Sequence, residues 1–303
     1  MLSDAGSRAW RATDVADATL WRRELPQGVT RVMAEAQAEA HARRDASGDA
    51  RTLCPALGPV LDGAAAALDG GPGFVVLDRL ELEGLDAGAA RRLYLAIAQA
   101  VGKPLAQDRG GQLFCDVIDA APPPAPGEKT VPGSRQADLP FHTDNAFGAI
   151  FPDYVGMLCI RRAATGGLFQ LVSAYTVLQE LERCDVRLLR ALEQPVPFAA
   201  GRIMRAGEET HAAPPVVSWD NGELVFRYLR LQIQEARLPR EQVQALDAVD
   251  EVLASPRVRV EIAMREGEMC YFSNRWLLHS RTRFENAGPL RPRHHVRLWL
   301  SRS

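Results

Sequence analysis

The stretch LPFHTDNAF, residues 139–147, divides the chain into two parts with different sequence patterns. On its N-terminal side, residues 1–70 carry alanine-rich segments with helical spacing of apolar residues, and residues 86–102 form an amphipathic pattern that ends at Gly102. On its C-terminal side, short apolar runs follow one another at residues 153–162, 167–174, 214–229, 257–264, 268–280 and 293–301. We therefore expect a helical N-terminal region followed by many short strands.

Shorter signals complete this pattern. Residues 72–80 and 111–119 are typical of strands, and WDNGELVF, residues 219–226, contains the Asn-Gly turn of a β-hairpin. Two further helices are expected at residues 174–193 and 239–255, where the apolar spacing is again helical. Helices are thus few where strands are many, which argues for a β-sandwich or barrel core with helical decoration.

One domain over residues 1–303 fits these signals best. We expect a mixed α+β class with a mainly β core, formed as a double-stranded β-helix (jelly roll) with helical decoration, on which the N-terminal helical region 1–70 packs. Residues 120–140 are too rich in proline and glycine for a helix or strand and lead directly into LPFHTDNAF. This loop is a candidate lid over a site, and a plain surface loop is the alternative.

Composition excludes several classes of function. The 303 residues carry a net charge of −2, so bulk electrostatics gives no attraction to nucleic acid or to an anionic membrane. The apolar runs are too short to span a bilayer, and the N-terminus has no signal-peptide pattern, so a cytoplasmic protein is expected. The five cysteines are scattered without a CxxC pair, which argues against a zinc ribbon or a disulfide framework. The expected partner is a small molecule, and the oligomeric state stays open.

His142 and Asp144 stand two residues apart within LPFHTDNAF. On a strand, residues i and i+2 point to the same face, so both side chains could reach the interior of a barrel. His279, at the end of the strand pattern CYFSNRWLLHSRTRF, is the best third ligand. Two histidines and one carboxylate with open positions form the facial arrangement of non-haem Fe(II) oxygenases, and a structural His–Asp pair is the alternative.

The motifs GFVVL, GKPLAQ, FHTDNAF, PDYVGMLCIRRAATGG, GELVFRYLR, GEMCYFSNRWLLHSRTRF and RHHVRLWLS occur in this order over residues 72–303. In this order the chain resembles the Fe(II)/2-oxoglutarate-dependent dioxygenases of the taurine dioxygenase and clavaminate synthase-like family. The resemblance implies that His142, Asp144 and His279 are the catalytic metal ligands. It also implies Fe(II) as cofactor, with 2-oxoglutarate and O2 as co-substrates.

The resemblance assigns the far carboxylate of 2-oxoglutarate to Arg297 on the final strand, with Arg293 as the main competitor. An arginine suits this role because its guanidinium can hold a carboxylate through two hydrogen bonds. Relatives often carry a serine or threonine that bonds 2-oxoglutarate where this chain has Phe169. Gln170 and Ser173 are the nearest alternative donors. The absence of a serine or threonine at position 169 is expected to affect the affinity for 2-oxoglutarate.

Asp144 also bears on the type of reaction, since halogenating relatives lack this carboxylate. The resemblance therefore implies hydroxylation, desaturation or cyclisation of an unactivated carbon. The substrate is expected to be an amino acid or amino-acid derivative, free or carrier-tethered, in specialised biosynthesis. Candidate substrate contacts are Asn145, Phe147, Arg230 and Arg281.

Three alternatives remain open at this point. The first is a catabolic dioxygenase that oxidises a sulfonate or a small organic acid. The second is a non-catalytic relative that binds a ligand without a metal, which would be expected to lack one of the three metal ligands. The third is a zinc or nickel cupin-type hydrolase or isomerase, which would not need an arginine that binds a co-substrate carboxylate.

Overall fold

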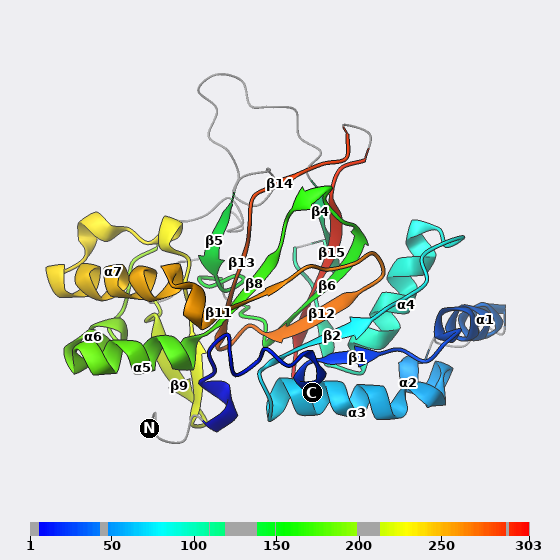
Figure 1. Ribbon diagram of the computed structural model, residues 1–303, viewed down its shortest axis with the longest axis horizontal. Coiled ribbons are helices and arrows are strands. Elements are labelled where there is room, and N and C mark those ends of the chain that lie inside the picture. The colour runs from blue at the N-terminus through cyan, green and yellow to red at the C-terminus, as the bar shows by residue number, and fades with distance from the viewer. Residues whose placement is uncertain are drawn as a thin grey trace.

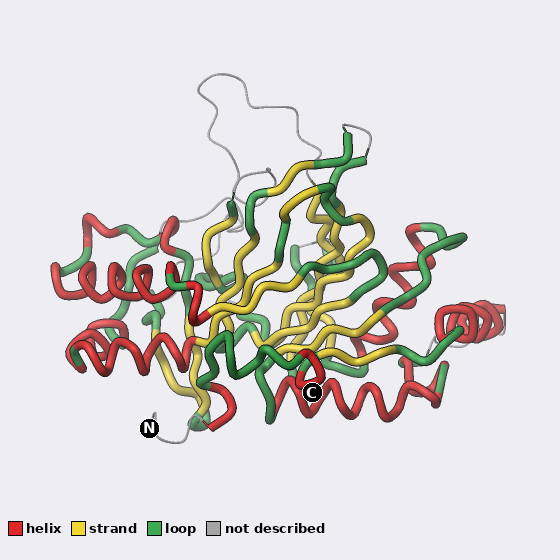
Figure 2. Tube along the Cα trace, viewed as in Figure 1, coloured by secondary structure: helices red, strands yellow, loops and turns green. Residues whose placement is uncertain are grey.

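The computed structural model describes residues 6–42, 48–108, 110–118, 138–148, 150–198, 213–288 and 291–302. Most of the candidate lid, residues 120–140, lies outside these ranges. The mixed α+β class with a mainly β core is confirmed: strands fill the centre and helices flank them on both sides (Figure 2). None of the described helices combines the length and apolar character that a bilayer crossing requires.

Seven helices lie within the described ranges, in two groups. They are α1 (Val29–Ala42), α2 (Ala50–Leu53), α3 (Gly58–Asp69), α4 (Ala87–Gln99), α5 (Ala174–Cys184), α6 (Val186–Leu192) and α7 (Arg240–Ala254). The first four come from the N-terminal third and gather at one end of the molecule, and the last three gather at the other (Figure 1). Residues 1–70, where helices were expected, contain α1 to α3 and the short strand β1 (Arg22–Glu24).

The larger sheet has seven strands in the order β1-β2-β12-β6-β15-β3, with β4 also paired to β15. Its strands are β1 (Arg22–Glu24), β2 (Phe74–Asp78), β3 (Lys103–Leu105), β4 (Phe114–Ile118), β6 (Tyr154–Arg161), β12 (Met269–Ser273) and β15 (His294–Ser301). The β1–β2 pair is parallel, and the other pairs are antiparallel. The strands expected within residues 72–80 and 111–119 are β2 and β4.

The smaller sheet has four strands in the order β11-β8-β13-β5. These strands are β5 (Leu139–His142), β8 (Phe169–Ser173), β11 (Arg259–Ile262) and β13 (Leu277–Arg281). Two short pairs complete the set: the β7 (Thr165–Gly166) and β14 (Phe284–Glu285) pair, and the hairpin of β9 (Val217–Asp220) and β10 (Glu223–Phe226). In that hairpin Asn221 and Gly222 both have positive φ, as the Asn-Gly signal predicts.

The larger sheet separates two hydrophobic cores. Its outer face packs on α3 and α4 through residues such as Leu61, Leu93 and Leu298. Its inner face shares a core with the smaller sheet, and the contact of Phe272 on β12 with Phe169 on β8 joins the two sheets at a ring separation of 5.2 Å. Because side chains alternate along a strand, β15 places Leu298 in the outer core and its neighbours toward the inner one.

Three local expectations are corrected. Residues 174–193 form two helices, because Asp185 leaves the helical conformation and its carboxylate caps α6 by accepting from the N–H of Arg187. The segment CYFSNRWLLHSRTRF is not one strand: it forms β12 in the larger sheet and β13 in the smaller sheet, joined by a turn at 274–276. Finally, β5 ends at His142, so Asp144 lies in a turn.

Candidate metal centre

His142, Asp144 and His279 come together in the interior between the sheets, with potential ligand atoms within 4.8 Å of one another. His142 on β5 and His279 on β13 are direct partners in the strand register, and their ring centroids are 4.0 Å apart. The Nε2 atom of each ring lies 3.5 Å from Oδ1 of Asp144. The three residues predicted from the sequence therefore point at one common space.

Asp144 reaches this space because other segments hold the turn that carries it. The buried Asn274 accepts from the N–H of Asp144 at 2.7 Å and donates to its carbonyl at 3.0 Å and to that of Pro152 at 3.1 Å. One residue earlier, Thr143 exchanges two hydrogen bonds with the backbone of Tyr228. The turn after β5 thus has a fixed backbone on both sides.

The two carboxylate oxygens of Asp144 have different surroundings. Oδ1 faces both histidines, whereas Oδ2 accepts from Nε1 of Trp299 at 2.7 Å and lies 3.0 Å from Nη1 of Arg297. Burial raises the pKa of Asp144, but Arg297 and the two histidines outweigh this effect and hold the pKa well below its usual value. Asp144 is therefore an anion at neutral pH.

Both histidines direct Nε2 toward the common space. His142 Nδ1 lies 2.9 Å from the carbonyl oxygen of Pro140. A carbonyl can only accept, so Nδ1 carries a proton and Nε2 is the ring atom that faces Asp144. Burial and the proximity of His142 lower the pKa of His279 to about 4, so the His279 ring is neutral at pH 7.

This donor set fits a cation. The Nε2 atoms of His142 and His279 and an oxygen of Asp144 each offer one ligand atom, and these atoms are close enough together for a single metal ion to bind all three. Two imidazoles and one carboxylate match the donor set of non-haem Fe(II) oxygenases. His279 Nδ1 has no hydrogen-bond partner among the described residues, and contacts with the rings of Phe169 and Phe272 orient His279 instead.

The two candidate co-substrate arginines lie in different surroundings. Arg297 on β15 donates through Nε to Gln107 at 2.9 Å and pairs with Asp144, so it lies beside the candidate ligands. Arg293 precedes β15 and is 4% exposed, and burial followed by the charge of Arg281 lowers its pKa to about 10. The described residues supply no carboxylate partner for the Arg293 guanidinium.

Arg293 and Arg281 both lie on the ring of Phe284. Their guanidinium carbons are 5.5 Å and 4.5 Å from its centroid. Such cation–π contacts hold the two guanidinium groups close together on one aromatic ring in the interior. Arg281, predicted as a substrate contact, therefore lies beside the predicted co-substrate residue Arg293.

The replacement donors considered for 2-oxoglutarate have other partners. Phe169, at the position where relatives often carry a serine or threonine, is buried beside His279. Gln170 accepts from Ser280 and donates to Glu261, and Ser173 donates to the backbone carbonyl of Arg8. Both side chains are thus occupied by contacts within the chain.

The remaining predicted substrate residues are not all directed at the candidate metal centre. Arg230 contacts the carboxylates of Glu235, Asp247 and Asp250. Asn145 has a positive φ of 50° and donates to the carbonyl of Ile150, so its amide serves the turn. Phe147 stacks on Phe198 at the edge of the inner core.

Residues that sequence reasoning missed include Trp299, Asn274 and Gln107. His295 is 3% exposed, its Nδ1 has no partner among the described residues, and burial followed by Arg293 holds its pKa well below the usual value. His294 is directed the other way and contacts Asp116, as strand alternation predicts. Strand alternation could have identified Trp299, because it stands two residues after Arg297 and therefore lies on the same face of the final strand.

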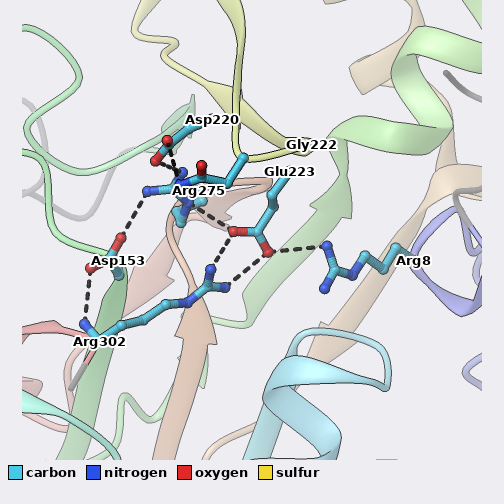
Figure 3. A pocket seen from close by; sticks show the side chains of 8 residues that line it. Arg8, Asp153, Asp220, Gly222, Glu223, Arg275 and Arg302 are labelled. Carbon is cyan, nitrogen blue, oxygen red and sulfur yellow. Dashed lines mark hydrogen bonds and ion pairs between the residues drawn. The ribbon is translucent and has the colours of Figure 1, made fainter.

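A separate charged hollow lies around Glu223 and is shown in Figure 3. Three arginines point toward the Glu223 carboxylate. Its oxygens lie 2.9 Å from Nη2 of Arg302, 3.0 Å from Nη1 of Arg8 and 3.0 Å from Nε of Arg275. Burial raises the pKa of Glu223, but these arginines outweigh it and keep the pKa lowered. Because Arg275 follows Asn274, this cluster also anchors the turn that holds Asp144.

Comparison with known proteins agrees with this geometry. The family model "Taurine catabolism dioxygenase TauD, TfdA family" matches residues 41–299. FR-33289 synthase of Streptomyces rubellomurinus (strain ATCC 31215) is 24% identical over 98% of this chain and 89% of that protein. Uridine-5'-phosphate dioxygenase of Amycolatopsis sp is 31% identical over 46% of this chain and 52% of that protein.

Solved structures share the fold at low sequence identity. Asparagine oxygenase in complex with Fe(II), 2S,3S-3-hydroxyasparagine and succinate has a TM-score of 0.69 at 21% identity. The non-haem iron oxygenase OrfP with Fe and alpha-ketoglutaric acid has a TM-score of 0.69 at 17% identity. Each similarity covers 93% of this chain and 94% of the other. The chain thus belongs to the TauD, TfdA family and is a non-haem iron, 2-oxoglutarate-dependent dioxygenase.

Proposed function

We propose that the enzyme oxidises an amino acid or an amino-acid derivative at an unactivated carbon, within a single domain whose two facing sheets form a double-stranded β-helix. The proposal rests on the convergence of His142, Asp144 and His279 beside the partly buried Arg297, with the buried Arg293 four residues earlier in the chain. The triad would hold Fe(II). When bound, Fe(II) with 2-oxoglutarate and O2 supplies an oxidant that breaks a C–H bond, while 2-oxoglutarate yields succinate and CO2.

The surroundings of the two arginines favour Arg293 for the far carboxylate of 2-oxoglutarate, which reverses the order expected from the sequence. Arg297 already has an anionic partner in Asp144. Arg293 is nine-tenths buried and lacks a carboxylate partner among the described residues, so a carboxylate would relieve a large desolvation cost there. The Phe284 ring keeps the Arg293 guanidinium in place for this contact.

Arg297 has a second role in this proposal. It keeps N–H donors beyond those used by Asp144 and Gln107, and it lies next to the triad. An anionic group of the substrate could bind to these donors and so bring the reacting carbon close to the triad. Positioning of this kind is the main contribution that a protein makes to a cofactor-driven oxidation.

The substrate class is supported by two kinds of relative. Asparagine oxygenase and OrfP, whose structures contain hydroxyasparagine and L-Arg, share the fold. FR-33289 synthase, whose similarity covers nearly the whole chain, is consistent with a role in specialised biosynthesis. We propose that the substrate is free or carrier-tethered, and that residues 120–140 act as a lid. A sulfonate or a small organic acid is the alternative substrate.

A substrate screen tests the proposal. Fe(II)-loaded enzyme with 2-oxoglutarate and O2 would be given free amino acids, pantetheine-linked aminoacyl thioesters, and sulfonates, and succinate would be measured against the uncoupled background. We expect an amino-acid compound to raise succinate release in step with formation of oxidised product. Stimulation by sulfonates alone would refute the substrate class.

Arginine variants test the co-substrate assignment. In anaerobic calorimetry, Arg293→Met is expected to weaken 2-oxoglutarate binding roughly 10–100-fold, since the charge-assisted bonds that it removes are worth about 1.5–3 kcal/mol. The matched variant Arg297→Met is expected to weaken it less. The opposite order would return the co-substrate role to Arg297.

A further inference from the structure

Trp299 lies at the end of the candidate metal centre that faces the larger sheet. Its ring is 4% exposed, and its Nε1 donates to Asp144 Oδ2 at 2.7 Å. Arg297 precedes it by two residues on β15, so both side chains lie on the same face of the strand. The guanidinium carbon of Arg297 lies 4.9 Å from the Trp299 ring centroid, so the two residues form one contiguous surface against Asp144.

These contacts divide the carboxylate between two environments. Trp299 and Arg297 both contact Oδ2, while both histidines face Oδ1. An indole N–H can only donate, so Trp299 cannot compete with Asp144 for a metal and can only orient it. Asn274 fixes the backbone of Asp144 from the other side. Backbone and side chain are thus held by different elements.

The division matters because a carboxylate can bind a cation through one oxygen or two. A second oxygen on the metal would occupy a position that an oxygenase must leave open for its co-substrates. A donor on Oδ2 at hydrogen-bond distance opposes that second contact, since the oxygen cannot turn to the metal without losing the bond. Arg297 alone is a weaker restraint, because its long side chain has several rotatable bonds.

We propose that Trp299 is a positioning residue that holds Asp144 as a one-oxygen metal ligand and keeps its other oxygen turned away. The inference rests on the proposed role of Asp144 as a metal ligand. Its chemistry involves no change of bonding at Trp299, only the hydrogen bond from the indole N–H.

The test replaces Trp299 by phenylalanine, which keeps an aromatic ring and removes the N–H. Calorimetric titration with Co(II), in the absence of 2-oxoglutarate, is expected to show metal binding weakened roughly 10–100-fold. The visible absorption bands of bound Co(II) are expected to change as well, because they report the number and arrangement of ligands. The matched control is Trp276→Phe, since Trp276 is fully buried and its Nε1 has no hydrogen-bond partner in the part of the chain that the structure describes.

The outcomes separate this inference from the proposed function. If Asp144→Ala leaves Co(II) affinity unchanged, the proposed metal site is wrong. If Asp144→Ala weakens binding but Trp299→Phe retains wild-type affinity and wild-type Co(II) bands, the role of Trp299 alone is overturned. An equal loss in Trp276→Phe would also overturn it, because packing would then explain the effect.

A second measurement covers the case in which Trp299→Phe does not fold. The protein has five tryptophans, so a 15N-labelled sample gives five indole N–H resonances. The Trp299 resonance, assigned by elimination with the other four Trp→Phe variants, is expected to shift in Asp144→Asn because its acceptor changes charge. An unchanged Trp299 resonance would contradict the hydrogen bond on which the inference rests.

Discussion

Replacing Asn274 by alanine should damage both the stability of the protein and its metal site. The Asn274 amide makes three hydrogen bonds, one from the N–H of Asp144 and one each to the carbonyls of Asp144 and Pro152. The residue is completely buried, so its loss leaves three buried backbone groups without these partners. At about 1–3 kcal/mol for each unsatisfied group, and allowing for relaxation, we expect a loss of about 3–6 kcal/mol.

This loss is a large share of the roughly 5–15 kcal/mol that stabilises a typical domain. Urea unfolding of the metal-free protein measures it, and calorimetric titration with Co(II) measures the effect on the site. The matched control is Gln242→Ala, which also removes a buried amide that donates to backbone carbonyls, but between α6 and α7. We expect both variants to lose stability and only Asn274→Ala to lose metal affinity.

The reasoning would be refuted by either of two results. One is a loss of stability in Asn274→Ala below about 1 kcal/mol, which would mean that its bonds are replaced by water or by other groups. The other is equal metal affinity in the two variants, which would mean that the backbone of Asp144 needs no support from Asn274.

Three further predictions concern stability. Glu223→Gln should lower the free energy of unfolding by about 1–3 kcal/mol at pH 7. The pKa of Glu223 is lowered in the folded protein, so the stabilisation is present above the unfolded pKa of about 4.3 and is lost as the pH falls through the folded pKa. Urea unfolding should therefore show a difference between wild type and variant that shrinks at acid pH, and a pH-independent difference would contradict the prediction. Asp185→Ala should cost about 0.5–2 kcal/mol by removing the cap of α6, and an unchanged melting temperature would refute this. Gly73→Ala should lower the melting temperature more than Gly84→Ala. Both glycines have positive φ, but an added Cβ would lie 2.2 Å from Trp276 at Gly73 and would meet nothing at Gly84. An equal decrease in melting temperature would show that backbone strain, and not the contact with Trp276, determines the effect.

The regular elements could largely be predicted from the sequence, because local periodicity encodes them. Helices α4 and α7 and the β9–β10 hairpin follow directly from apolar spacing and from the Asn-Gly turn. The break at Asp185 was missed because the apolar spacing continues across it, although aspartate is a common helix cap. The crossing of the chain between the sheets at 274–276 was missed because no glycine or proline marks it.

The candidate site could be predicted only in part. His142, Asp144 and His279 were found because their residue types and order carry the signal. Trp299 and Asn274 act on Asp144 from 155 and 130 residues away, and neither contact has a local pattern. The relative roles of Arg293 and Arg297 depend on which of them already has an anionic neighbour, which only the folded structure provides.

Iron uptake tests the central claim most directly. Metal-free protein would be equilibrated with Fe(II) under anaerobic conditions and the bound iron measured for wild type, His279→Ala and the control His41→Ala, a change at an exposed residue of α1. We predict about one Fe(II) per chain in wild type and His41→Ala, and little or none in His279→Ala. Equal iron content in all three proteins, or none in wild type, would contradict the assignment of His142, Asp144 and His279 as the iron ligands.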